Sequence, residues 1–313
     1  VTALLRGGRG RAANRSPGGG AVLGEPGAPG EPVDPVDEAA IVDFDSRYDT
    51  PRLAPVTVVI AAHDEEHGLP GVLAGLPTEL CGLPCDVLVV DDGSTDATAA
   101  LAERSERCYV VRCRTNRGQG AALRLGYRVA RERGAAYLIT TDADGQYDVA
   151  DLPAVLGPIL EGRADFVTGS RRRGRRPEQD PMRRLGVYVF AWVVTCLTGR
   201  YLTDTSFGLR AMRAESTARV TLRQAQYQSS ELLIGMISHG YRVLEVPGTM
   251  HARGAGTTKK GNNWAYGCRY AGVVLGTWWR EGCPSPATAC PAVRGRPRPV
   301  RVAHEVSRER VDR

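Results

Sequence analysis

Short runs of apolar, often β-branched residues recur along the first half of the chain, and each run stops at polar residues. The runs lie at 56–66, 85–96, 108–112 and 136–145. Their apolar residues are nearly continuous, which is typical of strands that are buried on both faces. Helices are expected between them, at 68–76, 95–106 and 118–133. The alternation of strands and helices predicts an α/β fold in which helices cover a parallel sheet.

The second half of the chain is less regular. Strands are expected at 164–171 and 241–247. A helix is expected at 229–241, where Ser229 or Ser230 would cap its first turn.

Composition sets both ends of the 313-residue chain apart from its middle. Residues 1–50 are rich in Gly, Pro and Arg and lack hydrophobic periodicity, and 284–313 are similar. Such segments cannot bury enough apolar surface to fold, so we expect disordered tails there. One globular domain is expected at 55–282.

The formal net charge of +6 suggests nucleic acid or an anionic membrane as a partner. Much of the excess lies in the two tails and in the sequence RRRGRR at 171–176. A nucleic-acid-binding protein would use these basic segments and would leave the acidic strand ends described below unexplained. We therefore expect no nucleic-acid partner.

Cysteine usage and the N-terminal sequence indicate the compartment. The eight cysteines lack the C-x-x-C spacing of a zinc site, and a chain of this length needs no disulfides. No apolar run follows the early arginines, as a secretory signal would require. A cytoplasmic location is therefore expected.

Acidic side chains gather where the predicted strands end. They are Asp64, Glu65, Asp91, Asp92, Asp142 and Asp144. In open α/β sheets, ligands bind beyond the carboxyl ends of the strands. We therefore expect the ligand site at this acidic edge.

The sequence DADGQ at the end of the fourth run suggests a metal site. Residues i and i+2 of an extended segment point to the same side, so Asp142 and Asp144 would project together. Their carboxylates and the Gln146 amide are hard oxygen ligands that suit Mg²⁺ or Mn²⁺. A turn rich in Asp and Gly is the alternative interpretation, but the neighbouring acidic strand ends favour the metal.

Glycines in NRGQGAAL (116–123) lie at the start of a predicted helix, beside Arg117. A helix start of this kind suits an anion or a close backbone contact. The segment lacks the P-loop pattern, and no G-x-G-x-x-G follows the first strand, which disfavours a dinucleotide-binding fold.

Eight short sequences occur in a specific order. They are AAHDEE, VVDDGSTD, NRGQGAAL, TTDADGQ, TGSR, DTSFGLRA, SSELL and HARGAGTTKKG. Over about 55–270 the chain resembles family 2 glycosyltransferases with the GT-A fold. It is most similar to the branch of dolichyl- and polyprenyl-phosphate mannose and glucose synthases. The resemblance implies a Rossmann-like, mostly parallel sheet flanked by helices in a single catalytic domain.

The resemblance also implies roles for particular residues. The nucleotide of the donor would lie against Ala62, Asp64, Glu65, Asp91 or Asp92, and Arg117. Asp142, Asp144 and Gln146 match the metal-binding DAD-x-Q of the family. Arg253 and Lys259 match the basic residues that hold a phosphate of the donor or of the lipid acceptor.

One motif departs from the family pattern. The usual SGFR reads here as Ser206-Phe207-Gly208-Leu209-Arg210, with Phe and Gly exchanged. The pocket on the acceptor side is therefore expected to be altered.

The implied reaction is an inverting transfer that depends on Mg²⁺ or Mn²⁺. A hexose, mannose in preference to glucose, would pass from a nucleoside-diphosphate sugar to polyprenyl phosphate. A phosphate acceptor is already ionised, whereas a hydroxyl acceptor would need a carboxylate base. Glu231 is the candidate base, although an acid in the first turn of a helix is also explained by the helix dipole. A soluble family member that acts on a small-molecule or protein hydroxyl is the alternative.

Membrane contact would come from 171–199. The uncharged run 185–199 is too short to cross a bilayer comfortably. With the arginines before it, the run could lie in the interface at the inner face of the cell membrane. A buried core helix is the alternative interpretation.

Overall fold

The computed structural model describes residues 34–175, 181–252 and 263–283. The tails predicted at the two ends of the chain lie outside these ranges, except for residues 34–50.

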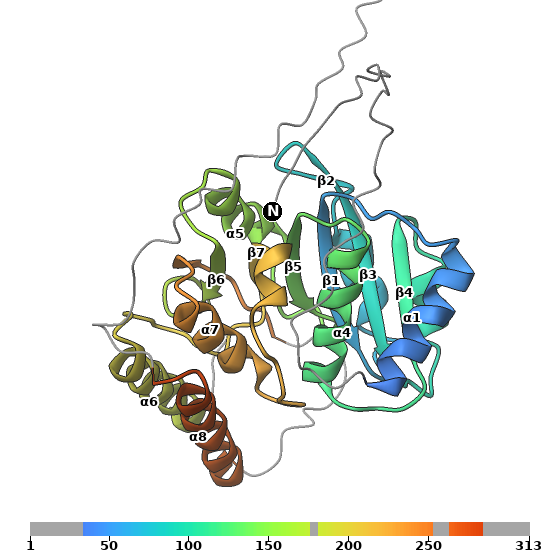
Figure 1. The fold of residues 1–313 in the computed structure, drawn as a ribbon. Coiled ribbons are helices and arrows are strands. Elements are labelled where there is room, and N and C mark those ends of the chain that lie inside the picture. The colour runs from blue at the N-terminus through green and yellow to red at the C-terminus, as the bar shows by residue number, and fades with distance from the viewer. Residues whose placement is uncertain (1–33, 176–180, 253–262, 284–313) are drawn as a thin grey trace, which may run out of the picture.

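Within the described residues, a mixed eight-stranded sheet forms the centre of the molecule (Figure 1). Its strand order is β4-β3-β1-β5-β7-β6-β8, and β2 pairs antiparallel with the start of β3. The strands are β1 Val56–Ala62, β2 Glu79–Leu80, β3 Leu83–Asp92, β4 Cys108–Cys113, β5 Tyr137–Asp142, β6 Phe166–Ser170, β7 Arg210–Arg213 and β8 Val243–Pro247.

Helices cover both faces of this sheet (Figure 1). They are α1 Pro35–Tyr48, α2 Leu69–Gly75, α3 Thr98–Glu103, α4 Gln119–Glu132, α5 Leu152–Leu160, α6 Pro181–Thr198, α7 Gln228–Ser238 and α8 Asn263–Arg280. Apolar residues of α1, α4 and α7 form the core on one face, and those of α2 and α5 the core on the other. α8 packs on α6 and α7 at the end of the molecule beyond β6.

The predicted α/β class is confirmed, with one difference in the sheet. Strands β4, β3, β1 and β5 are parallel to one another, as are β6 and β8. β7 is antiparallel to both of its neighbours. It was missed because its sequence, RAMR, is short and charged at both ends, so it shows no apolar run.

One face of α4 is apolar and packs on the sheet. Ala122, Leu125 and Val129 are fully buried. A Cβ at Gly126 would lie 2.5 Å from a methyl group of Val59, so this glycine lets the helix approach the sheet closely. The middle of α4 therefore packs closely on β1 and β3.

The predicted serine cap of α7 is wrong, and no serine caps α3 either. α3 begins at Thr98, whose backbone N–H is accepted by Asp96, while the Ser94 hydroxyl accepts the N–H of Asp64. α7 begins after Tyr227 without a side-chain cap, and Ser230 donates instead to the carbonyl of Thr205. Both serines bind partners outside their own helix, which spacing along the chain does not reveal.

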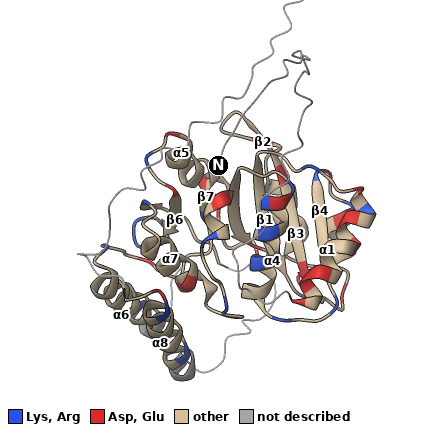
Figure 2. Ribbon diagram, in the orientation of Figure 1, with Lys and Arg blue, Asp and Glu red and all other residues tan. Residues whose placement is uncertain are grey.

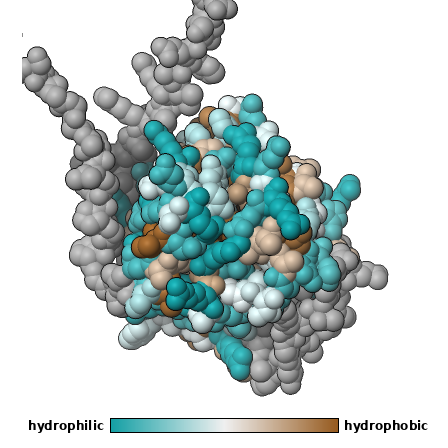
Figure 3. Space-filling view, turned by 90° about the vertical axis from the view of Figure 1, so that its right-hand side faces the viewer, coloured by the Kyte–Doolittle hydropathy of each residue, from teal (hydrophilic) through white to brown (hydrophobic). Residues whose placement is uncertain are grey.

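The predicted disorder of 1–50 is wrong for its last part, because Pro35–Tyr48 forms α1. Asp34 caps the helix by accepting the N–H of Val36, and Phe44 is fully buried against the sheet edge at β4. The helix carries both acidic and basic residues (Figure 2), and the surface on this side of the molecule is mainly hydrophilic (Figure 3). Its Pro- and Asp-rich flanks hid the helical spacing of a few apolar residues.

The packing of α1 can be tested at Phe44. The substitution Phe44→Ala should lower the free energy of unfolding by about 3–5 kcal/mol, because it leaves a cavity in the core. Val42→Ala, at a position that is 68% exposed on the same helix, is the matched control and should change stability by less than about 0.5 kcal/mol. Urea denaturation measures both, and equal effects would mean that α1 does not pack as described.

Candidate active site

The carboxyl ends of β3, β1 and β5 lie side by side. In the register of the sheet, Ala62 is opposite Asp91 and Ala61 is opposite Asp142. The acidic strand ends therefore meet at one edge, as the sequence predicted. Ala62 itself is buried, so its backbone rather than its side chain borders the edge.

Hydrogen bonds join the loop after β1 to the loop after β3. The Asp64 carboxylate accepts the N–H of Thr95 at 2.8 Å, and the Glu65 N–H donates to the Thr98 hydroxyl at 2.8 Å. The backbone N–H of Thr95 lowers the pKa of Asp64, which keeps this exposed carboxylate ionised. Asp64 and Glu65 are thus fixed beside β3, where the sequence placed them.

The two acids at the end of β3 have different roles. Asp91 is 5% exposed and accepts the N–H of Ser94 at 3.1 Å, and burial raises the pKa of Asp91. Asp92 is 2% exposed and accepts the N–H groups of Arg117 and Gly118, the latter at 2.7 Å. Asp92 is therefore committed to holding the turn before α4.

Arg117 does not extend toward the acidic edge. Its guanidinium donates to Asp34 at 2.5 Å and to Asp37 at 2.6 Å, both at the start of α1. Only the backbone of Arg117 belongs to the turn at the edge. Two carboxylates at the start of α1 bind its guanidinium, and contact between Arg117 and the donor stays a prediction.

The DADGQ loop lies at the end of β5. Asp142 is partly exposed and its Oδ1 accepts from the side chain of Gln119 at 2.9 Å. Asp144 is 7% exposed and accepts the N–H of Gln146 at 3.0 Å, while Ala143 between them is buried. β5 ends at Asp142, and Ala143 and Asp144 lie in the turn after it, so the predicted alternation of an extended segment does not continue past Asp142.

These two aspartates have the chemistry of a Mg²⁺ or Mn²⁺ site. Over 34–175, 181–252 and 263–283, no group of three or more His, Cys, Asp or Glu side chains is arranged to hold a metal ion. Mg²⁺ is commonly bound by one or two carboxylates together with substrate phosphates, so a pair of carboxylates fits such an ion. The Gln146 side chain is oriented by its amide nitrogen, which donates to the His251 carbonyl at 3.4 Å.

The exchange of Phe and Gly in the sixth predicted motif, DTSFGLRA, has a steric reason. Gly208 donates its N–H to the Tyr147 hydroxyl, and a Cβ there would lie 2.8 Å from that hydroxyl and 3.1 Å from Asp142 Oδ2. Phe207 is buried and packs edge-on against the Tyr147 ring. Gly208 thus leaves room for the Asp142 carboxylate.

Glu231, the candidate base, is buried and committed to structure. Its carboxylate accepts the N–H groups of Arg223 and Gln224, at 2.9–3.0 Å, and pairs with Arg280 of α8 at 2.8 Å. It is 0% exposed. These partners give the Glu231 carboxylate a structural role, holding the loop before α7 and α8 together, and its role as a base stays a prediction.

Two residues near the edge were not selected from the sequence. Gln119 bonds Asp142, and His251 donates its backbone N–H to the carbonyl of Gln146 at 2.7 Å. Both are in predicted motifs, but only tertiary pairing reveals their partners. Arg253 and Lys259 lie outside the described residues.

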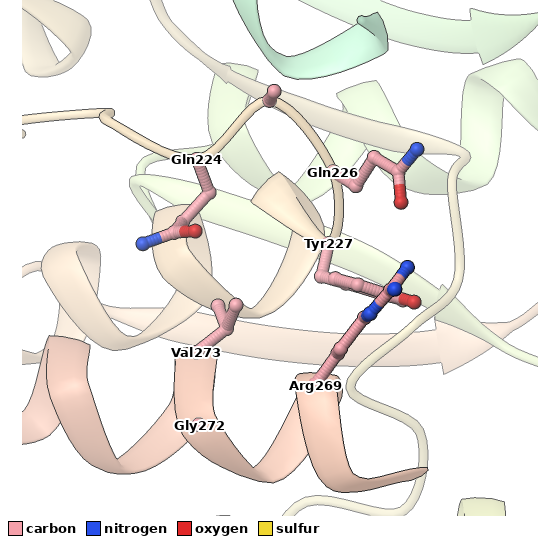
Figure 4. Close-up of a pocket in the computed structure, with 7 residues that line it drawn as sticks. Gln224, Gln226, Tyr227, Arg269, Gly272 and Val273 are labelled. Atoms are coloured by element: carbon pink, nitrogen blue, oxygen red, sulfur yellow. The ribbon is translucent and has the colours of Figure 1, made fainter. Parts of the chain in front are cut away.

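A shallow cavity of about 390 Å³ lies between α8 and the loop before α7 (Figure 4). Gln224, Gln226 and Tyr227 face Arg269 and Val273 of α8 across it. The same loop also touches the start of α4, because the Ala225 carbonyl accepts the N–H of Gly120 at 2.8 Å. The loop therefore separates the cavity from the turn that carries Gln119.

Exposed apolar side chains gather on α6 and α8. They are Leu185, Tyr188, Val189 and Trp192 of α6, and Leu275 and Trp279 of α8. We call this set the α6/α8 surface. Ala191 and Val194 on the other side of α6 are buried, so the helix is partly core and partly exposed. None of the helices in the described ranges is long and apolar enough to cross a bilayer.

Part of the basic patch before α6 is used inside the fold. Arg171 pairs with the buried Asp204 at 2.6 Å, and Arg173 contacts Glu245 at 3.8 Å. Arg172 stacks over the Tyr188 ring of α6 at 4.0 Å. The patch therefore offers a membrane fewer charges than its sequence suggests.

Comparison with known proteins identifies the family. The family model described as glycosyl transferase family 2 matches residues 57–219. The chain belongs to this family. The region matched contains the acidic edge, β1 to β7 and the DADGQ loop.

Curated relatives of this glycosyltransferase include enzymes named for lipid phosphates. An undecaprenyl-phosphate mannosyltransferase of Micrococcus luteus is 30% identical over 65% of this chain and 86% of its own length. A polyprenol monophosphomannose synthase of Mycolicibacterium smegmatis is 32% identical over 64% of this chain and 79% of its own.

Solved structures agree on the fold. Glucosyl-3-phosphoglycerate synthase of Mycobacterium tuberculosis, crystallised with Mn²⁺, UDP-glucose and phosphoglyceric acid, superposes with a TM-score of 0.52 at 18% identity. The match covers 76% of this chain and 83% of that one. The fold is therefore that of the GT-A glycosyltransferases, as predicted.

The structural role of Glu231 can be tested with Glu231→Gln. Removing one charge of the buried pair with Arg280 should lower the free energy of unfolding by about 3 kcal/mol. Sugar transfer per folded molecule should stay within about threefold of the parent, since no reacting group is lost. Thermal unfolding and transfer rates measure the two effects. A catalytic base would instead show a rate loss of about 100-fold or more with unchanged stability.

Proposed function

We propose that this glycosyltransferase moves a hexose from a nucleoside-diphosphate sugar to polyprenyl phosphate, with inversion at the anomeric carbon. The observation that carries the proposal is the pair of carboxylates, Asp142 and Asp144, at a strand-end edge in a chain about 30% identical to enzymes named for polyprenyl-phosphate substrates. Mannose is preferred to glucose because both of these relatives are named for mannose.

The donor would bind across the ends of β1 and β3. The exposed Asp64 carboxylate and the backbone around Ala62 are suited to hydrogen bonds with a base or ribose, and Glu65 and Asp91 border the same loop pair. These groups are held by bonds between the two loops, so the donor would meet a preorganised surface.

Asp142 and Asp144 would hold a divalent cation, Mg²⁺ or Mn²⁺. When bound, the ion would neutralise charge on the departing diphosphate. Gln119 orients the Asp142 carboxylate, and Gly208 leaves space beside it. The metal is supported by the fold neighbour that was crystallised with Mn²⁺ and UDP-glucose.

The reaction itself needs no base from the protein. An oxygen of the acceptor phosphate forms the new bond to the anomeric carbon, while the bond from that carbon to the diphosphate oxygen breaks. The electron pair of the broken bond leaves with the nucleoside diphosphate. Since the phosphate nucleophile is already ionised, the commitment of Glu231 to structure is compatible with this chemistry. Arg253 and Lys259 are proposed to hold the phosphates.

The acceptor is expected to arrive from the α6/α8 surface. Exposed Trp192 and Trp279 suit the interface of a bilayer, where aromatic rings are favoured. Arg269 lines the cavity beside this surface and could meet an anionic head group at the inner face of the cell membrane. An apolar surface of this kind favours a lipid acceptor over a small soluble one.

The metal site is tested by Asp144→Asn in the full chain. Transfer of labelled sugar to a short polyprenyl phosphate is measured with GDP-mannose, UDP-glucose and related donors, with Mn²⁺ or Mg²⁺ and then with EDTA. We expect labelled sugar on the lipid only when metal is present. The transfer rate of Asp144→Asn should fall about 100-fold or more, because a bound metal ion lowers the activation barrier by several kcal/mol.

Asp43→Asn is the matched control for that experiment. Asp43 is an exposed acid of α1, paired with Arg47, and should leave transfer unchanged. Full transfer by Asp144→Asn, or with EDTA, would reject the metal assignment. Transfer to phosphoglycerate or a hydroxyl compound in place of lipid would reject the lipid acceptor.

Membrane contact is tested by the double substitution Trp192→Ser and Trp279→Ser. Binding to vesicles that contain phosphatidylglycerol should fall about tenfold or more, because two large apolar side chains no longer enter the interface. Vesicle flotation measures this, and Val42→Ser on the hydrophilic side of the molecule is the control. Unchanged flotation of the double variant would exclude the α6/α8 surface as the contact.

A further inference from the structure

Helix α1 reaches the candidate site through one side chain. The Arg117 guanidinium donates from Nη1 to Asp34 and from Nη2 to Asp37, at 2.5 and 2.6 Å. Both acids precede the region that the family model matches, which begins at residue 57. The contact therefore joins Arg117, inside the matched region, to two acids that lie outside it.

This contact is well shielded from water. The side chains of Arg117 and Asp37 are 16% and 9% exposed, and Nη2 also contacts Cys113 Sγ at 3.6 Å. Burial alone would lower the pKa of Arg117, but the hydrogen bond and charge of Asp37 outweigh it and raise the pKa. A shielded, charge-assisted pair fixes the arginine more firmly than a surface pair would.

Arg117 belongs to a turn that is also held from its other sides. Its backbone N–H and that of Gly118 donate to Asp92. A Cβ at Gly93 would lie 2.7 Å from the backbone of 115–116, so β3 approaches the turn without a gap. On the third side, Gly120 donates to the Ala225 carbonyl.

The next residue in the turn connects it to the acidic edge. Gln119 donates from Nε2 to Asp142 Oδ1 at 2.9 Å. The position of Gln119 follows from the turn, because Gly118 before it has a φ of 94° that few other residues adopt. A shift of Arg117 would therefore also move Gln119, two residues later, which is the hydrogen-bond partner of Asp142.

We propose that Asp34 and Asp37 are positioning residues for sugar transfer, acting through Arg117 and Gln119 on the Asp142 carboxylate. The inference rests on the proposed role of Asp142 at the metal and diphosphate. In this arrangement, α1 does more than cover the sheet edge: its first turn sets where one carboxylate of the site is held.

The alternative is that α1 only stabilises the fold. Its packing through Phe44 lies on a different part of the helix from the ion pairs, so the two roles can be separated by substitution. Asp37→Asn removes the better shielded charge. Asp34→Asn is the second variant, because asparagine is an equally good N-cap, so the helix cap is kept while the pair with Arg117 and the longer 4.0 Å contact with Arg124 are weakened.

Glu38→Gln is the matched control. Glu38 is the neighbouring acid on α1 and pairs with Arg128 of α4 at 2.6 Å, away from the turn. The substitution Glu38→Gln removes a carboxylate charge from the same helix. Thermal unfolding of all three variants shows how much stability each has lost.

The test measures hydrogen–deuterium exchange of the full chain without ligands, in peptides that cover 115–120 and 139–148. Asp37→Asn and Asp34→Asn should speed exchange in both peptides about tenfold, as expected for loss of a charge-assisted hydrogen bond. Glu38→Gln should leave both unchanged. The measurement uses no donor or acceptor, so its outcome is independent of whether polyprenyl phosphate is the acceptor.

A double-mutant cycle with Gln119→Ala identifies the path. In the Gln119→Ala background, Asp37→Asn should still speed exchange in 115–120 but should no longer change 139–148. In transfer assays, Asp37→Asn should raise KM for the nucleotide sugar about tenfold when Gln119 is present. In the Gln119→Ala variant it should leave KM unchanged. The proposal is overturned if 139–148 is unchanged in both α1 variants, if Glu38→Gln has the same effect, or if Gln119→Ala leaves the effect of Asp37→Asn intact.

Discussion

The parallel pairing of β1 with both β3 and β5 is the constraint on which the rest of the candidate site depends. Parallel neighbours end on the same side of a sheet, so Ala62, Asp91 and Asp142 meet at one edge although they are far apart in the chain. β1 is buried on both faces and cannot shift without exposing its apolar side chains. The acids at the strand ends are therefore brought together by burial of apolar strands rather than by any attraction between the acids.

Buried carboxylates hold several loops of the fold. Asp92 accepts N–H groups of the turn before α4, Glu231 those of the loop before α7, and Glu245 those of Thr203 and Asp204. An ionised group away from water needs such donors, since its desolvation is otherwise strongly unfavourable. Asp92, Glu231 and Glu245 are therefore occupied in holding loops of the fold.

Two sides of the molecule differ in surface character, in a way that matches the proposed reaction. The side with α1 is mainly hydrophilic and closes the edge of the sheet at β4 (Figure 3). The opposite end carries the exposed apolar residues of α6 and α8 (Figure 1). The acidic edge lies between them, so a polar donor and an apolar acceptor could approach it from different directions.

The sequence by itself determined the α/β class, most strands and helices, and the acidic edge. Each of these follows from local signals: continuous apolar runs, helical spacing, and acids that directly follow a strand. The family also follows from the order of short motifs, each read within a few residues. β7 and α1 were missed because RAMR and the Pro- and Asp-rich segment before β1 carry weak local patterns.

Only the tertiary structure decided what each charged side chain does. Arg117, Glu231 and Asp92 all looked like site residues, and all three are bound to partners far away in the chain. Gln119 looked like an unremarkable helix-start residue, yet it holds Asp142. A side-chain partner is set by packing between distant elements, and a buried charge takes whichever partner that packing supplies. Spacing along one strand or helix carries no information about that choice.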